Sequence, residues 1–160
     1  NWSKNIPAEF IGRLSDHSNI GGIKFSTSNA VDIEKAISFQ SDQFQVITAV
    51  VKQFFSSLAL GAKAGTTVEA CLFPDGISSI YAHYTRGDYD ASLHQQRKLN
   101  RQIEKTITSA SHDNFLRVAE IKYALSLRGI CTPTVSRPYR SLNSKEQSII
   151  RTALALGDKT

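Results

Sequence analysis

Short apolar runs alternate with amphipathic segments along the first half of the chain. The short runs are typical of buried strands, whereas apolar residues that recur every three or four positions are typical of one face of a helix. The pattern predicts a helix over residues 7–15 and then three strand-plus-helix units, with strands over 20–24, 44–49 and 64–70. Such alternation favours a parallel sheet whose strands are connected and covered by helices.

Capping residues mark where these helices begin and end. Pro7 suits the first turn of the first helix, and Ser28 or Asn29 can cap the second. The third and fourth helices are expected to end at Gly61 and Gly87, because glycine readily adopts the backbone conformation that terminates a helix. Their apolar faces comprise Val51, Phe54, Phe55 and Leu58, and Ile77, Ile80, Tyr81 and Tyr84.

Strand patterns stop after residue 87. Long helices are predicted over 88–109 and 114–128, followed by an ordered, proline-containing loop over 130–142. Asn143 and Glu146 have the spacing of a capping box, which predicts the start of a last helix. The pattern therefore divides the chain into an α/β region over 1–87 and a helical region over 88–160.

Composition indicates a globular chain. With 160 residues, of which 41% are hydrophobic, the chain can bury the core of one domain. No apolar run approaches the roughly 20 residues needed to cross a bilayer, so we expect no membrane association and a cytoplasmic location. The net charge of +5 raises the question of nucleic acid, but the densest basic run, over 97–105, is expected to be the solvated face of a helix. Nucleic-acid binding is therefore not expected.

The two cysteines give no sign of a metal or disulfide framework. Cys71 and Cys131 lie 60 positions apart by their numbers, without the Cys/His spacing of a zinc site. We expect both to be buried thiols, and we expect no metal site.

Residues at the carboxyl ends of the predicted strands form the candidate site. In a parallel sheet these ends meet at one edge, where functional groups gather. Lys24 and Ser26 share one face at the end of the first strand, Ala49 ends the second, and Thr66 lies in the third. In a regular third strand, Glu69 would point away from this pocket and have a structural role.

Lys24 is the residue with the most chemical potential in this set. Shielding from water by Ile20 and Ile23 would favour its neutral amine, which is the form that attacks a carbonyl carbon. From residue types alone the alternative stays open, because a lysine at a strand end is more often a solvated surface charge.

Four motifs follow one another along the chain, with sequences NIGGIKFS over 19–26, LGAKAGTTV over 60–68, IKYAL over 121–125 and SRPY over 136–139. In order and spacing they resemble the motifs of the dihydrodipicolinate synthase and N-acetylneuraminate lyase family. Members of that family are (β/α)8 TIM barrels with a helical C-terminal extension. The resemblance implies the C-terminal half of such a barrel within 1–87, with strands six to eight over 20–25, 44–49 and 64–70. Residues 88–160 would be the helical extension.

If the chain is half of a barrel, it is expected to associate with the other half. A complete barrel of this kind needs about 250 residues, so the chain of 160 residues is expected to be a piece of a longer protein and to be inactive alone. The resemblance places the family's proton-relaying tyrosine and its threonine pair upstream of Asn1. We therefore expect the N-terminal half of the same barrel as a partner, and a homo-oligomer, since homotetramers are common in the family.

The resemblance also implies roles for individual residues. Lys24 matches the lysine that forms a Schiff base with pyruvate or another 2-oxo acid, and no metal or organic cofactor is implied. Ser26 matches a hydroxyl near the substrate, with a serine bonded to its own backbone as the alternative. Ala49 and Thr66 fall at substrate-facing positions, where the family usually has glycine and isoleucine.

Val50 and Val51 depart from the family pattern. In neuraminate lyases acidic residues at these positions hold the sugar hydroxyls, so a sialic acid substrate is not favoured and the valines are expected to line an apolar part of the pocket. The function implied is a pyruvate-dependent aldolase or lyase. The alternative is a noncatalytic binding or assembly module derived from that family.

Overall fold

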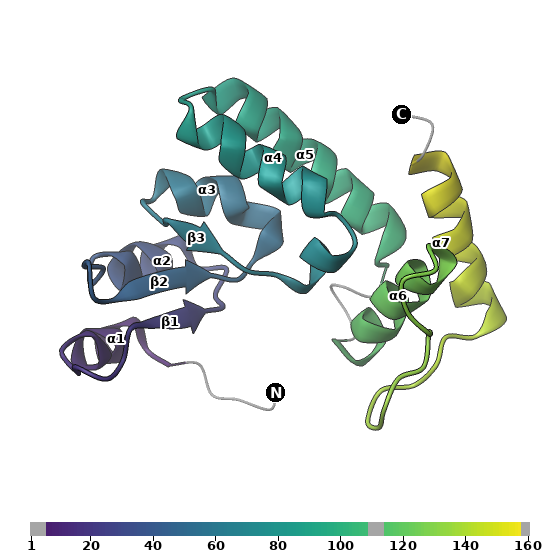
Figure 1. Cartoon of the computed structure of the whole chain (residues 1–160), viewed down its shortest axis with the longest axis horizontal. Helices are drawn as coiled ribbons and strands as arrows, with labels where there is room; N and C mark the ends of the chain where they lie inside the picture. Colours follow the sequence, from purple (N-terminus) through teal and green to yellow (C-terminus); the bar gives the residue numbers. More distant parts are fainter. Residues whose placement is uncertain (1–5, 109–113, 158–160) are drawn as a thin grey trace. The chain divides into compact units, whose positions relative to one another are not determined.

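The computed structural model describes residues 6–108 and 114–157 (Figure 1). These residues form two compact units. The first comprises residues 6–67 and 77–96, and the second comprises residues 68–76, 97–108 and 114–157. The predicted boundary between a partial barrel over 1–87 and a helical extension over 88–160 is a separate matter, and it stays a prediction.

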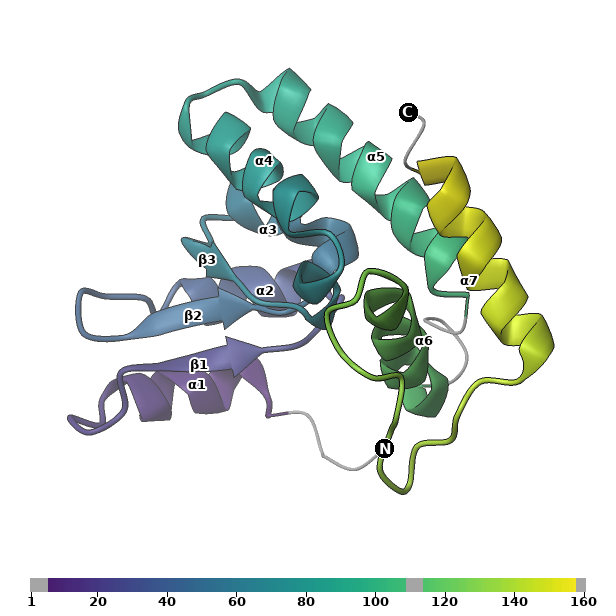
Figure 2. The same ribbon diagram turned by 45° about the vertical axis from the view of Figure 1, so that its right-hand side comes forward.

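A three-stranded parallel sheet covered by helices forms the first unit, which confirms the predicted α/β organisation. The strands lie in the order β1 (Gly22–Phe25), β2 (Gln45–Thr48) and β3 (Ala64–Gly65). The helices are α1 (Ala8–Ser15), α2 (Ala30–Ile37), the 3₁₀-helix η1 (Val51–Gln53), α3 (Phe54–Ala59), most of α4 (Pro74–Thr85) and the start of α5 (Tyr89–Thr106). Figure 2 shows α4 and α5 side by side, and the Ser92 hydroxyl of α5 donates to the Ile80 carbonyl of α4 at 2.8 Å.

One face of the sheet carries a core of this unit. Ile23 and Phe25 of β1 pack on this face with Val46 of β2, Ile11 of α1 and Ala36 of α2. Side chains alternate between the two faces of a strand, so Lys24 projects from the opposite face. Strand register places Lys24 beside Ile47 and Ile47 beside Ala64 on that second face.

The predicted helix ends are confirmed. The side-chain oxygen of Asn29 accepts the N–H of Val31 at 3.0 Å and so caps α2. Gly61 and Gly87 follow α3 and α4 with φ angles of 103° and 80°. Residues with a Cβ rarely adopt such positive φ angles, so glycine is suited to these helix ends.

The predicted strand over 64–70 is wrong beyond its first residues. β3 covers only Ala64–Gly65, although the N–H of Thr66 still donates to the Thr48 carbonyl at 2.8 Å. Residues 68–71 instead form the 3₁₀-helix η2 (Val68–Cys71), in the second unit. This turn buries Glu69, which is 1% exposed, against the guanidinium of Arg117. A buried carboxylate requires such a partner, and strand alternation does not take that requirement into account. The structural role expected of Glu69 agrees with its burial in this ion pair.

Helices form the second unit, and those after residue 88 agree with the predicted helical region. They are η2, the end of α5, α6 (Asn114–Leu127) and α7 (Ser144–Gly157). In α5 the side chains of Leu99 and Ile103 are buried, while Arg97, Lys98, Arg101 and Lys105 are exposed, which confirms the amphipathic pattern of 97–105. Partial burial removes water from the Arg117 guanidinium, and this desolvation lowers the pKa of Arg117.

The expectation of buried thiols is wrong for both cysteines. Cys71 ends the short turn η2 and Cys131 lies in the loop after α6, and both side chains are exposed. Neither position belongs to the buried face of a long helix or strand, which is where small apolar side chains are usually covered.

A reciprocal cap begins the last helix, α7, as predicted. Asn143 accepts the N–H of Glu146 at 2.9 Å, and Glu146 accepts the N–H of Asn143 at 2.8 Å. The guanidinium of Arg140 also donates to Glu146, at 2.7 and 2.9 Å. The hydrogen bonds from Arg140 and from the Asn143 backbone lower the pKa of Glu146 to about 2.

Across the part of the chain that the structure describes, no helix is both long and apolar enough to cross a bilayer.

We predict that an added methyl group is not tolerated at Gly22 but is tolerated at Gly21. A Cβ at Gly22 would lie 2.4 Å from the Gln45 carbonyl oxygen, whereas the nearest atom to a Cβ at Gly21 would be 3.9 Å away. Gly22→Ala should therefore lower the free energy of unfolding by about 2 kcal/mol, because β1 and β2 must move apart. Urea denaturation of the two single variants measures this difference, and equal effects at the two glycines would contradict the close packing.

We predict that the Glu146 carboxylate makes the cap of α7 sensitive to acid. Because its pKa in the fold is about 2, below the ordinary value of 4.5, its contribution is present above pH 4.5 and is lost as the pH falls towards 2. At pH 7, Glu146→Ala should cost about 1 kcal/mol and Glu146→Gln less, since glutamine keeps the reciprocal cap. Denaturation at pH 7 and pH 3 tests this; a Glu146→Gln variant with unchanged acid sensitivity would refute it.

Candidate active site

The carboxyl ends of β1, β2 and β3 lie at the same edge of the sheet, because the three strands are parallel (Figure 1). The residues that follow each strand therefore meet there: 26–29 after β1, 49–50 after β2 and 66–67 after β3. In α/β folds this edge is where ligands bind.

Lys24 and Ser26 line one open hollow of about 460 Å³ at this edge. Thr27 follows them, and Asp32 of the first turn of α2 lines the same hollow. Lys24 itself is exposed. The expectation that Ile20 and Ile23 shield Lys24 from water is wrong for this chain, because the Lys24 side chain is exposed.

Asp32 is a candidate that sequence analysis did not identify. Its position in the first turn of α2, directly after the loop that begins at Ser26, is the signal that could have found it, since helix N-termini after parallel strands face this edge. A carboxylate in the same hollow as an amine can stabilise its charged form or accept its proton. Glu9 also lines the hollow, but it already binds Lys35, and this hydrogen bond lowers its pKa.

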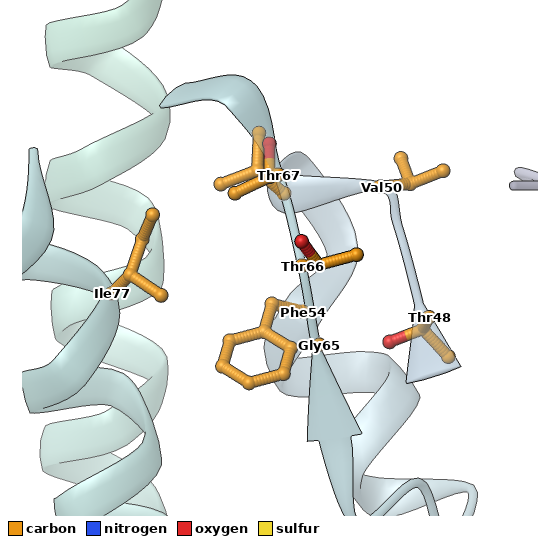
Figure 3. A pocket seen from close by; sticks show the side chains of 8 residues that line it. Thr48, Val50, Phe54, Gly65, Thr66, Thr67 and Ile77 are labelled. Carbon is orange, nitrogen blue, oxygen red and sulfur yellow. The ribbon is translucent and has the colours of Figure 1, made fainter. Parts of the chain in front are cut away.

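Thr66 lies in a different hollow, a narrow crevice of about 10 Å³ at the ends of β2 and β3 (Figure 3). The crevice is lined by Thr48, Val50, Val51, Phe54, Gly65, Thr66, Thr67 and Ile77. Ala49 is half-buried and lines neither hollow. The structure thus groups Lys24 with Ser26 and groups Thr66 with the two valines, and the roles of all four predicted site residues stay predictions.

Two glutamine side chains fix the loop between β2 and α3. Gln96 of α5 is 4% exposed; its amide donates to the Val51 carbonyl at 3.0 Å and its oxygen accepts the N–H of Phe55 at 2.8 Å. Gln53 donates to the Thr27 carbonyl at 2.9 Å, which connects this loop with the one that follows β1. Sequence analysis missed both glutamines, since their partners lie 26 to 45 positions away.

No group of three or more histidine, cysteine or acidic side chains suited to a metal ion occurs within residues 6–108 and 114–157.

The chain is similar to known proteins over most of its length. The family model described as "Dihydrodipicolinate synthetase family" matches residues 3–156. A 4-hydroxy-tetrahydrodipicolinate synthase of Methanosphaerula palustris is 25% identical over 156 residues, which cover 97% of this chain and 52% of that protein. One of Prosthecochloris aestuarii is 28% identical over 153 residues, covering 94% and 49%. The chain therefore spans about half the length of the curated relatives it matches.

Solved structures agree with this assignment. Dihydrodipicolinate synthase of Bacteroides thetaiotaomicron matches with a TM-score of 0.83 and 27% identity, over 96% of this chain and 52% of that one. The enzyme of Thermotoga maritima matches with a TM-score of 0.79 and 22% identity, over 98% and 52%, which supports the fold alone.

We predict that Gln96 is needed for the geometry of this edge. Gln96→Ala should lower the free energy of unfolding by about 2 kcal/mol, because the Val51 carbonyl and the Phe55 N–H both lose their partner in a buried place. The neighbouring Gln95→Ala is the matched control and should change it by less than about 0.5 kcal/mol. Denaturation of both variants decides the matter, and a neutral Gln96→Ala would contradict the structural role of these two hydrogen bonds.

Proposed function

Because this chain belongs to the dihydrodipicolinate synthetase family, we propose that it is the C-terminal half of a lyase in which Lys24 forms a Schiff base with pyruvate or a related 2-oxo acid. One observation carries the assignment of the nucleophile. Lys24 lies near the carboxyl end of β1 and lines an open hollow together with Ser26 and Asp32; the start of α1 borders the same hollow.

The proposed Schiff-base reaction uses an amine as nucleophile, with a hydroxyl and a carboxylate near it. The neutral amine of Lys24 adds to the ketone carbon, water leaves, and a protonated imine results. This imine withdraws electrons from the adjacent methyl carbon, which loses a proton and becomes a nucleophile. It then forms a carbon–carbon bond with the carbonyl or imine carbon of an acceptor, and hydrolysis of the first imine releases the product and the lysine. The reverse sequence cleaves the same bond.

The neighbours of Lys24 are proposed to hold the substrate. The Ser26 hydroxyl lies in the same hollow and can donate to the carboxylate or carbonyl oxygen of the 2-oxo acid. Ala49 and Thr66 follow β2 and β3 at the same edge, and by family resemblance we assign them to the substrate side of the complete site. Asp32 is suited to receive or return a proton near the amine.

The proposal includes the rest of a barrel. The three strands leave the sheet face that carries Lys24 without a covering layer from α1 and α2, which pack on the other face. An N-terminal half of the same (β/α)8 barrel would cover it and complete the site. We further propose a homo-oligomer, a tetramer by family resemblance, in the cytoplasm.

We predict that borohydride traps pyruvate on Lys24 in the complete protein that contains this chain. Reduction of the imine leaves a stable secondary amine, so mass spectrometry should find the reduced pyruvyl group on the tryptic peptide that contains Lys24. Lys24→Arg should abolish the adduct, because the guanidinium stays protonated and cannot attack. Lys63→Arg, at an exposed position next to β3, is the matched control and should retain it.

An unlabelled Lys24 in a folded protein that binds pyruvate would support the alternative, a noncatalytic binding module. A label that survives Lys24→Arg would assign the chemistry to another residue.

A further inference from the structure

A hollow of about 230 Å³ lies within the second unit, between α6, the loop over 130–142 and the start of α7. The helices α6 and α7 pack beside each other (Figure 1 and Figure 2), and this loop belongs to their connection. Ala119, Tyr123 and Leu142 form the floor of the hollow and are 1%, 8% and 8% exposed. A single water needs only about 15 Å³, so the hollow has room for a small organic molecule.

The lining of this hollow combines apolar surface with polar groups. Pro133, Thr134 and Ser141 lie on its exposed rim, and the half-buried Gln147 of α7 borders it as well. The Gln147 amide donates to the Leu142 carbonyl at 3.0 Å, which holds the loop against the start of α7. Among the residues that the structure describes, none of those lining the hollow carries a charge. Small-molecule sites commonly have such a lining, in which a few polar groups orient a ligand on an apolar wall.

Two cations contact the polar groups of this lining. The guanidinium of Arg151 donates to the Tyr123 hydroxyl oxygen and lies over the Tyr123 ring, 5.9 Å from its centroid. The ammonium of Lys122 donates to the Thr134 carbonyl. Because the Tyr123 oxygen accepts from Arg151, its own proton remains for a further acceptor. A donor hydroxyl beside two positive charges favours an anionic group in the hollow.

The acidic side chain at the start of α7 does not neutralise these cations. The carboxylate of Glu146 accepts from the Arg140 guanidinium at 2.7 and 2.9 Å and from the Asn143 N–H at 2.8 Å. Within the described residues, neither Arg151 nor Lys122 forms an ion pair with an acidic side chain. The positive charge beside Tyr123 is therefore available to a ligand.

We propose that this hollow binds a small organic monocarboxylate with a compact apolar body. The carboxylate accepts from the hydroxyl of Tyr123 and from a rim hydroxyl, that of Thr134 or Ser141. The apolar body lies on Ala119 and Leu142. A neutral molecule of the same shape gains the apolar contact without the charge, so it binds more weakly. The inference is independent of the proposed Schiff-base function, because it concerns residues of the second unit alone.

A fluorinated pair of probes tests the charge preference. The complete protein that contains this chain should be titrated with 4-fluorobenzoate and, separately, with 4-fluorobenzyl alcohol, and binding followed by fluorine NMR. We expect saturable binding of the carboxylate and an affinity for the alcohol that is about tenfold lower, because hydrogen bonds to a charged acceptor are the stronger ones. Absence of saturable carboxylate binding, or equal affinities for the two probes, would overturn the proposal.

Thr134→Trp tests the location of the probe. The large ring should fill the hollow and lower the affinity for 4-fluorobenzoate at least about tenfold, since the apolar contacts and the rim hydroxyl are lost together. Thr132→Trp is the matched control, because Thr132 is also exposed in the same loop but does not line the hollow, and its affinity should be unchanged. A folded Thr134→Trp variant with full affinity would show that the probe binds elsewhere.

Tyr123→Phe keeps the ring and removes only the hydroxyl, so it decides the question even if Thr134→Trp does not fold. Its affinity for 4-fluorobenzoate should fall about fivefold, and an unchanged affinity would contradict the proposed recognition. Lys24→Arg should leave 4-fluorobenzoate binding intact. A loss of binding in that folded variant would place the probe in the hollow at Lys24 and overturn the proposal, whereas a missing pyruvate adduct on Lys24 would remove the proposed function alone.

Discussion

The parallel pairing of β1 with β2 is the constraint on which both the core and the candidate site depend. Their register aligns Ile23 with Val46 and Lys24 with Ile47. A slip by one residue would exchange the two faces of β1, burying the lysine under the helices and exposing Ile23. Gly22 lets the Gln45 carbonyl approach its Cα more closely than any side chain would permit. By allowing this close approach of β1 and β2, Gly22 helps to set the register that positions Lys24 two residues later.

Two neutral amide side chains help to hold the loops at the candidate site. Gln96 and Gln53 each bind backbone groups, and together they connect α5, the start of α3 and the loop that begins at Ser26. Amides can donate and accept at once, so one buried side chain satisfies groups that would otherwise lack partners. Such support allows an edge built of loops to keep a defined shape.

Local patterns predicted most of this fold because their causes are local. The caps at Asn29 and Asn143 and the glycine ends at Gly61 and Gly87 involve atoms within a few positions of one another, and each was confirmed. Lys24 and Ser26 line one hollow, as the sequence predicts, but so do Ile23 and Phe25, so a common face of Lys24 and Ser26 stays a prediction.

Features with distant causes escaped prediction. The strand expected over 64–70 is replaced after Gly65 by a turn that buries Glu69 against Arg117, 48 positions further on. Gln96 has no apolar or motif signal, and its partners Val51 and Phe55 lie more than 40 positions away. Asp32 could be identified only once the structure showed that the first turn of α2 lines the same hollow as Lys24. Sequence patterns report on neighbours along the chain, and these three residues act through neighbours in space.

The exposure of Lys24 connects these observations to function. A lysine that attacks a ketone must release its proton, and removal from water is one of the physical effects that favour this. The sheet face that carries Lys24 offers Ile47 and Ala64 beside it, both half-buried, but the helices α1 and α2 lie on the opposite face. The chain thus contributes an amine, a hydroxyl and a carboxylate to one hollow. If Lys24 reacts as proposed, a further layer of protein would have to remove water from this amine. In the proposed function, the nucleophile lies on the half of the barrel that this chain forms, and its cover lies on the other half.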